Sequence, residues 1–278
     1  PEEIQRFPNY RLGALHKQLD EAFGVGGTPA AGRAVERFLE SLDAATVHSI
    51  CEAYYQQAAE WRASRPLESI PVLRKAVAIS TYLRQTERSA FARKDIGDLY
   101  AAAGRTQDAL AAYRAVREDF PTCRAVGAWA ALSAAELHRL DGRLAEAVEA
   151  YRMVGRDYAD QLPQTLWALL WMGDTFRAAG KSADARAAWL RVLEDFNEPV
   201  YADVIGIAAR LLGQGTPETP RLPDDEFAND VAYFLAVQHQ MGGERDTAAV
   251  WYERCLALSK GNDWPRALAA RALKERAK

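Results

Sequence analysis

A unit of 38 residues is repeated three times in the middle of the chain, between Phe91 and Phe196. The positions in register carry the same or similar residues: Gly104, Gly142 and Gly180; Ala109, Ala147 and Ala185; Tyr113, Tyr151 and Trp189; Val116, Val154 and Val192. Each unit also closes on Asp-Phe or Asp-Tyr. Fixed periods of roughly 20 to 50 residues are typical of stacked arrays. Each unit is therefore predicted to form two helices, A and B, joined at its glycine.

The residues in register resemble those of the tetratricopeptide repeat (TPR). The third unit carries that pattern in Met172-Gly173, Phe176, Gly180, Ala185, Trp189 and Val192, and the first in Ile96-Gly97, Tyr100, Gly104, Ala109, Tyr113 and Pro121. In the second unit, Ala135 and His138 replace the glycine and the aromatic residue of helix A. The resemblance, to 38-residue repeats of bacterial type, implies an all-α fold. The fold that it implies is a right-handed α-solenoid of TPR-like helix-turn-helix repeats with N-terminal helices and a C-terminal capping helix.

Five segments follow from these patterns. We expect N-terminal helices in residues 1–43, a degenerate TPR-like helix pair in 44–89, three TPR-like repeats in 90–198, an extra helix and a Pro-rich loop in 199–226, and a last TPR-like repeat with a capping helix in 227–278. Small residues at Gly97, Ala135 and Gly173 are expected to let helices A and B of one repeat approach closely.

Helices outside the three repeats are predicted from apolar periodicity and end signals. Their expected bounds are about 10–23, 31–42, 44–62, 70–83, 199–212 and 264–274. Asp43 and Asp263 are the expected N-caps of two of them. Ser69-Ile70-Pro71 reads as a helix start, because proline is tolerated in a first turn. The glycine-rich stretch 24–27 is interpreted as a connector, since no Gly-Lys-Ser/Thr follows it.

The last repeat carries Leu235-Ala236, Gly243, Ala248, Tyr252 and Cys255 in the repeat positions. The terminal helix after it has one apolar face, as a cap over an open repeat end requires. The loop 213–226, with three prolines, is either an insertion or a functional element such as a lid.

Candidate partner-binding residues lie in the A helices, which line the concave inner face in this family. Three rows recur: aromatic Phe91, Trp129 and Trp167; acidic Asp98, Glu136 and Asp174; and mixed Lys94, Leu132 and Leu170. The aromatic row either holds a partner segment or packs against neighbouring A helices. Arg139 and Arg177 stand three residues after two of the acids and are placed to neutralise them. Together the rows predict a groove with an aromatic and aliphatic floor.

Within this family, some cochaperones hold the carboxylates of a peptide's C-terminus with Lys and Asn. Lys94 matches that lysine, but Asp98 stands in place of the asparagine and would repel a carboxylate. The four histidines lie on separate predicted helices, and His138 and His239 occupy an aromatic packing position. No catalytic motif or metal-ligand spacing accompanies them, and the acidic run Asp224-Asp225-Glu226 reads as a solvated helix start.

Composition narrows the class of partner. A net charge of −3 and an isoelectric point near 5.9 provide no general attraction to nucleic acid. The three cysteines are scattered and carry no Cys-x-x-Cys spacing, which favours isolated thiols. No run of about 18 apolar residues indicates a membrane span. No cofactor is expected.

The sequence therefore predicts a non-enzymatic scaffold or adaptor that binds a protein or peptide segment in its concave groove. An alternative is a regulatory or sensor protein that binds a small ligand or signalling peptide there. Residues 90–213 also loosely resemble bacterial repeats of outer-membrane assembly lipoproteins and cell-envelope coordinators. That resemblance leaves localisation open between the bacterial cytoplasm and the periplasm. The partner's identity and the oligomeric state are not predicted.

Overall fold

A computed structural model describes residues 29–214, 222, 227–259 and 264–276, with backbone alone at 29–34 and Ala63. Four predictions lie outside these ranges: the helix at 10–23, the connector at 24–27, the acidic run at 224–226 and the N-cap Asp263. Most of the Pro-rich loop lies outside them as well.

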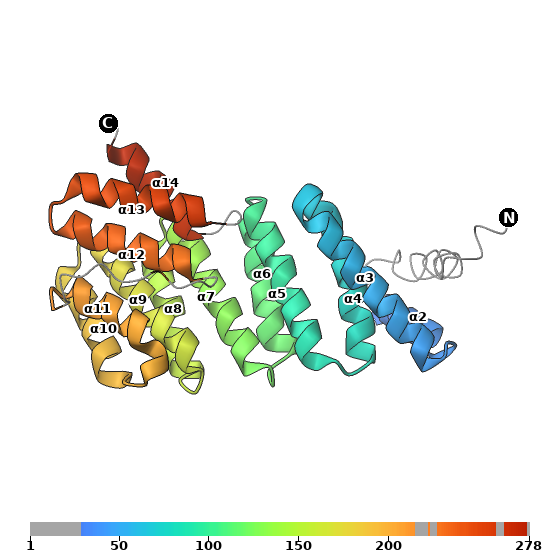
Figure 1. Cartoon of the computed structure of the whole chain (residues 1–278). Helices are drawn as coiled ribbons and strands as arrows, with labels where there is room; N and C mark the ends of the chain where they lie inside the picture. Colours follow the sequence, from blue (N-terminus) through green and yellow to red (C-terminus); the bar gives the residue numbers. More distant parts are fainter. Residues whose placement is uncertain (1–28, 215–221, 223–226, 260–263, 277–278) are drawn as a thin grey trace.

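Within the described ranges the chain forms α-helices and one 3-10 turn, and no strand. The helices, labelled in Figure 1, are α2 Pro29–Glu40, α3 Ala44–Ser64, α4 Pro66–Tyr82, α5 Thr86–Ala102, α6 Thr106–Asp119, α7 Arg124–Leu140, α8 Leu144–Asp157, α9 Leu162–Ala178, α10 Ser182–Asp195, α11 Ala202–Leu211, α12 Ala228–Met241, α13 Arg245–Leu258 and α14 Trp264–Arg276. The 3-10 turn is η2, Pro199–Tyr201. The three repeats are the pairs α5–α6, α7–α8 and α9–α10, as predicted.

The turn inside each repeat is closed by a glycine in the left-handed region. Gly104, Gly142 and Gly180 have φ of 71°, 76° and 74°. In the first repeat the amide of Arg105 donates to the carbonyl of Tyr100 at 2.9 Å, the hydrogen bond that closes a helix ending on a left-handed residue. Arg84 has φ of 57° between α4 and α5, so that turn has the same geometry without a glycine.

The close approach expected between helices A and B is present. A Cβ atom built on Gly97 would lie 2.4 Å from the ring of Tyr113, and one built on Gly173 would lie 2.2 Å from the ring of Trp189. Both distances are far below van der Waals contact, so only a residue without a side chain fits at these two positions. The aromatic residue of helix B fills the space beside each glycine.

One predicted helix start is wrong. Helix α4 begins at Pro66 rather than Ile70, with Pro66 in its first turn, and it ends at Tyr82. The Ser69 hydroxyl donates to the carbonyl of Pro66 at 2.7 Å, so Ser69 forms a hydrogen bond within the first turn and does not precede the helix. Pro71 lies within the helix on its exposed side, where the missing amide hydrogen bond is tolerated.

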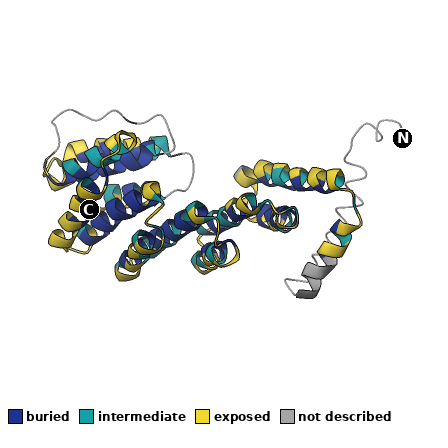
Figure 2. Ribbon diagram, turned by 90° about the horizontal axis from the view of Figure 1, so that it is seen from below, coloured by how far each residue is buried: buried dark blue, intermediate teal, exposed yellow. Residues whose placement is uncertain are grey.

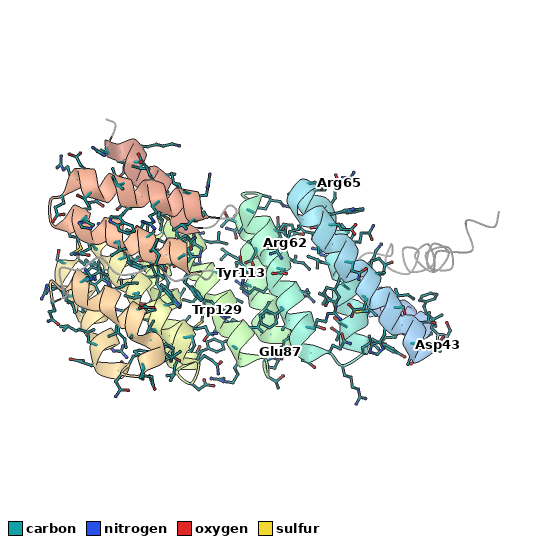
Figure 3. All side chains as sticks on the ribbon, in the orientation of Figure 1. Asp43, Arg62, Arg65, Glu87, Tyr113 and Trp129 are labelled. Carbon is teal, nitrogen blue, oxygen red and sulfur yellow. The ribbon has the colours of Figure 1, made fainter. Side chains whose placement is uncertain are left out.

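Other helix ends agree with prediction to within two residues. Asp43 is the N-cap of α3, because its carboxylate accepts a hydrogen bond of 2.9 Å from the amide of Thr46. In Figure 3, Asp43 and Arg65 mark the two ends of this helix. The extra helix predicted at 199–212 is divided into η2 and α11.

Two hydrophobic clusters meet at α7. One holds buried residues from α2 to α7 and the other holds buried residues from α7 to α14. The buried residues form dark-blue stripes along the helices in Figure 2. Helix α12 crosses the A helices α7 and α9 in Figure 1, and it packs on them instead of continuing the stack. We call this covered surface of α7 and α9 the rear inner face.

Helix α14 completes the C-terminal unit. Leu268 is buried against α12 and α13, in line with the predicted apolar face of the last helix. Trp264 meets the ring of Trp171 of α9 edge to face, with centroids 3.9 Å apart. The guanidinium of Arg271 donates to the carbonyl of Leu140 at 2.9 Å. The last helix therefore also fastens the unit to α7 and α9.

Candidate functional site

The aromatic row changes character along the array. Phe91 of α5 is 47% exposed, Trp129 of α7 is half-buried, and Trp167 of α9 is 5% exposed. The ring of Phe227 stacks on both tryptophans, with centroids 6.0 Å from Trp129 and 5.1 Å from Trp167 and an interplanar angle of 21° in each case. The rear members of the row therefore pack inside the protein, on Phe227. Of the three, Phe91 has the exposed ring, and its binding of a partner remains a prediction.

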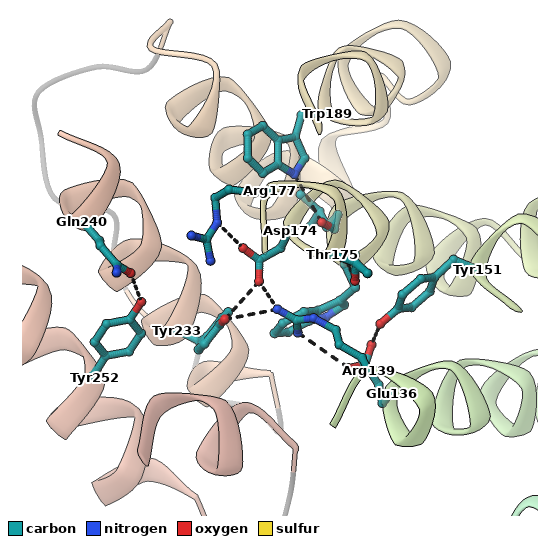
Figure 4. A network of polar contacts seen from close by, with 12 residues as sticks. Glu136, Arg139, Tyr151, Asp174, Thr175, Arg177, Trp189, Tyr233, Gln240 and Tyr252 are labelled. Atoms are coloured by element: carbon teal, nitrogen blue, oxygen red, sulfur yellow. Dashed lines mark hydrogen bonds and ion pairs between the residues drawn. The ribbon is translucent and has the colours of Figure 1, made fainter. Parts of the chain in front are cut away.

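A buried polar network lies where α12 covers the rear inner face (Figure 4). Asp174 of α9 is fully buried and receives three donors. Arg177 reaches its carboxylate at 2.6 Å, the hydroxyl of Tyr233 donates to it at 3.0 Å, and Arg139 of α7 forms an ion pair with it. The Arg139 guanidinium also donates to the Tyr233 hydroxyl at 3.3 Å. Residues from three helices thus satisfy one buried charge.

Arg177 neutralises Asp174 within one helix, as predicted. Arg139 differs, because its closest carboxylate is Asp174 on the neighbouring helix, while its distance to Glu136 is 3.8 Å. The Arg139 guanidinium also lies 5.0 Å from the ring centroid of Trp171, a cation–π contact. It therefore links α7 to α9 rather than only balancing its own helix.

The two buried carboxylates have opposite pKa shifts. Burial raises the pKa of Glu136 to about 8. Arg139 acts to lower this pKa but does not offset the effect of burial, and Asp174 raises it further. Burial also acts to raise the pKa of Asp174, but Arg177 and Arg139 outweigh it and hold this pKa below its usual range. The difference follows from geometry, since Asp174 has two close guanidinium partners and Glu136 has none.

In two successive repeats, a tyrosine hydroxyl of helix B donates to the acidic residue of helix A. The hydroxyl of Tyr113 donates to Asp98 at 2.8 Å, and Tyr151 donates to Glu136 in the same way one repeat later. In the third repeat Trp189 replaces the tyrosine and donates to the carbonyl of Leu170 at 3.2 Å instead. Asp174 accordingly takes its hydroxyl donor from Tyr233 of α12.

The predicted open groove is not present over the rear inner face. Leu132 and Leu170, expected in its floor, are buried in the core, as are Glu136, Arg139, Asp174 and Trp167. The reason is that α12 occupies the concavity with side chains of its own. A role of these residues in partner binding remains a prediction.

The front inner face, which we define as the neighbouring surfaces of α3 and α5 and the side of α7 next to α5, holds the remaining candidates. Lys94 forms an ion pair of 2.8 Å with Asp98, so Lys94 is not a free carboxylate ligand. Two further ion pairs join the helices, Arg62 with Asp95 at 3.0 Å and Arg88 with Glu52. Sequence reasoning missed these two pairs. Their separations of 33 and 36 residues, close to one repeat, were the available signal.

The histidines do not form a catalytic arrangement in the part of the chain that the structure describes. His138 is half-buried, and His239 has its Nδ1 atom 2.8 Å from a carboxylate oxygen of Glu244. Among the described residues, no group of three His, Cys, Asp or Glu side chains is placed to hold a metal ion. None of the helices in the described ranges combines the length and apolar character that crossing a bilayer requires.

Comparison with known families adds two matches. The model described as soluble NSF attachment protein matches residues 28–165, which run from the start of α2 into α9. A tetratricopeptide-repeat model matches residues 167–196, which hold most of α9 and all of α10. No curated protein matches the chain. With the paired helices, the glycine turns and the glycine–aromatic contacts, these matches show that the chain belongs to the tetratricopeptide-repeat family.

Proposed function

We propose that this protein is a non-enzymatic scaffold that binds a segment of a protein partner on the front inner face. The observation that carries the proposal is the contrast along the aromatic row. The rear inner face is already filled by Phe227 and α12, whereas Phe91 presents an exposed ring on the next A helix. Repeats of this family generally mediate contacts between proteins. The front inner face is the part of the concave side that remains for such a contact.

Contacts between the helices of the front inner face support this role. Two ion pairs join α3 to α5, and a third joins Lys94 to Asp98 within α5. The Arg88 guanidinium also lies 3.9 Å from the ring centroid of Tyr55 of α3. These contacts join the two helices in the absence of a partner. Ordering is then required of the partner segment alone, which lowers the entropic cost of binding.

A protein partner also agrees with the family match over this half of the chain. The proteins described by that model are named for attachment to another protein, NSF. The alternative, a regulatory or sensor protein, uses the same concave groove for a small ligand or signalling peptide. Side chains of α12 fill that groove over α7 and α9, and the front inner face that remains presents an exposed aromatic ring, which favours contact with a protein.

Affinity capture with matched variants tests the proposal. The full chain, Phe91→Glu and Val250→Glu are each used as bait in lysate of the source cells, and bound proteins are identified by mass spectrometry. Val250 of α13 is 62% exposed and lies outside the inner face, so its variant controls for an added surface charge. Circular dichroism verifies that all three remain helical.

A protein that is retained by the wild type and Val250→Glu but lost from Phe91→Glu is the expected result. If the same proteins bind to all three baits, the partner does not use the front inner face and the proposal is wrong.

A further inference from the structure

One aromatic side chain of the protein itself, Phe227, already stacks on two members of the aromatic row. Phe227 lies just before α12, and its single ring is stacked with two tryptophans that hold equivalent positions on successive A helices. Both angles are 21°, so each tryptophan ring lies nearly parallel to the ring of Phe227. One aromatic side chain thus bridges one step of the row, from Trp129 to Trp167.

The preceding step of the row is built in the same way and has no such ring among the described residues. Phe91 lies 38 residues before Trp129, the separation that also relates Trp129 to Trp167. Helices α5 and α7 pack side by side, as α7 and α9 do. No ring of the described chain stacks on Phe91, which is 47% exposed. The step from Phe91 to Trp129 therefore continues an established interface.

Charges around Phe91 point to an uncharged occupant. Lys94, Asp95 and Asp98 follow Phe91 at spacings that place them on the same side of α5. Each is in an ion pair, and so are Arg88 and Glu52 next to them. These five charges are compensated, and Glu87, four residues before Phe91, has no ion-pair partner among the described residues. The exposed ring, rather than a cluster of like charges, is therefore the distinguishing feature of this surface.

We propose that the step between Phe91 and Trp129 binds an aromatic side chain of the protein partner, stacked as Phe227 is stacked on the next step. The inference rests on the proposed function and names the residue class that the partner presents. Aromatic side chains are the usual anchors of protein interfaces, and truncating an anchor weakens binding by about tenfold or more.

Selection from a peptide library provides the test. Random 12-residue peptides displayed on phage are selected on the full chain after depletion on the Phe91→Ala variant. The expected peptides carry Phe, Tyr or Trp at one shared position. Replacing that residue by Leu, with synthetic peptides and fluorescence anisotropy, is expected to reduce affinity by about tenfold. The variant Val250→Ala is expected to bind the same peptides as the wild type does.

A second variant separates stacking from apolar contact. Phe91→Leu keeps the apolar bulk without the ring, and it is expected to lose most of the affinity. Wild-type affinity in Phe91→Leu, or selected peptides without an aromatic residue, would overturn the aromatic site while leaving the front inner face as a binding surface. If no peptide depends on Phe91 at all, both this inference and the proposed function are wrong.

Discussion

The hydroxyl of Tyr233 in α12 donates a 3.0 Å hydrogen bond to the carboxylate of Asp174 in α9, across 59 residues of sequence. This bond joins the C-terminal unit to the central repeats inside a buried charge network. A buried carboxylate needs its donors, because an unsatisfied charge in the interior is costly. The bond therefore contributes to the position of α12 on the rear inner face.

Tyr233→Phe removes the hydroxyl and keeps the ring. We expect the free energy of unfolding to fall by about 1–3 kcal/mol, since the lost bond is buried and its acceptor is charged. Tyr113→Phe is the matched control, because its hydroxyl donates to the partly exposed Asp98, and a smaller loss is expected. Urea denaturation measures both. Equal losses in the two variants would contradict the importance of the buried network.

The raised pKa of Glu136 predicts a pH dependence of stability. This pKa is about 8 in the folded chain, above the ordinary 4.5, so the folded state holds a proton that the unfolded state releases. Stability from this group is present below about pH 4.5 and is lost as pH rises toward 8. The slope is at most about 1.4 kcal/mol per pH unit.

Glu136→Gln keeps the shape of the side chain and cannot ionise. Urea denaturation of both proteins between pH 5 and pH 8 is expected to show a steeper fall in stability for the wild type. The acidic Asp174 and the basic Arg139 remain in both proteins, so the difference between the two curves reports Glu136. Parallel curves would show that Glu136 does not hold a proton in the folded chain.

Gly97→Ala tests the contact between helices A and B of the first repeat. The added Cβ atom would lie 2.4 Å from the ring of Tyr113, so the helices must separate or the ring must move. We expect a loss of about 1–3 kcal/mol in the free energy of unfolding. Gly155→Ala in α8 is the control, because no atom lies within 4 Å of its added Cβ. There, better helix propensity predicts a gain of about 0.5–1 kcal/mol, measured by thermal or urea unfolding.

Local features of the fold are readable without the structure. The glycine turns and the glycine–aromatic contacts depend on residues within one repeat, and the structure confirms both. The start of α4 was misplaced because Pro66 and Pro71 carry similar start signals. The structure places Pro66 in the first turn and Pro71 inside the helix.

By itself, the sequence determined the paired helices, their 38-residue period and the positions of the aromatic and acidic rows, because each depends on interactions within a repeat or between adjacent repeats. Only the tertiary structure decided which part of the inner face stays open. Phe227 and Tyr233 have the local pattern of an ordinary loop end and an ordinary helix. Phe227 stacks on Trp129 and Trp167, and Tyr233 donates to Asp174, so these contacts join segments about 60 to 100 residues apart. A periodic sequence signal does not encode contacts between segments that lie outside the repeat register.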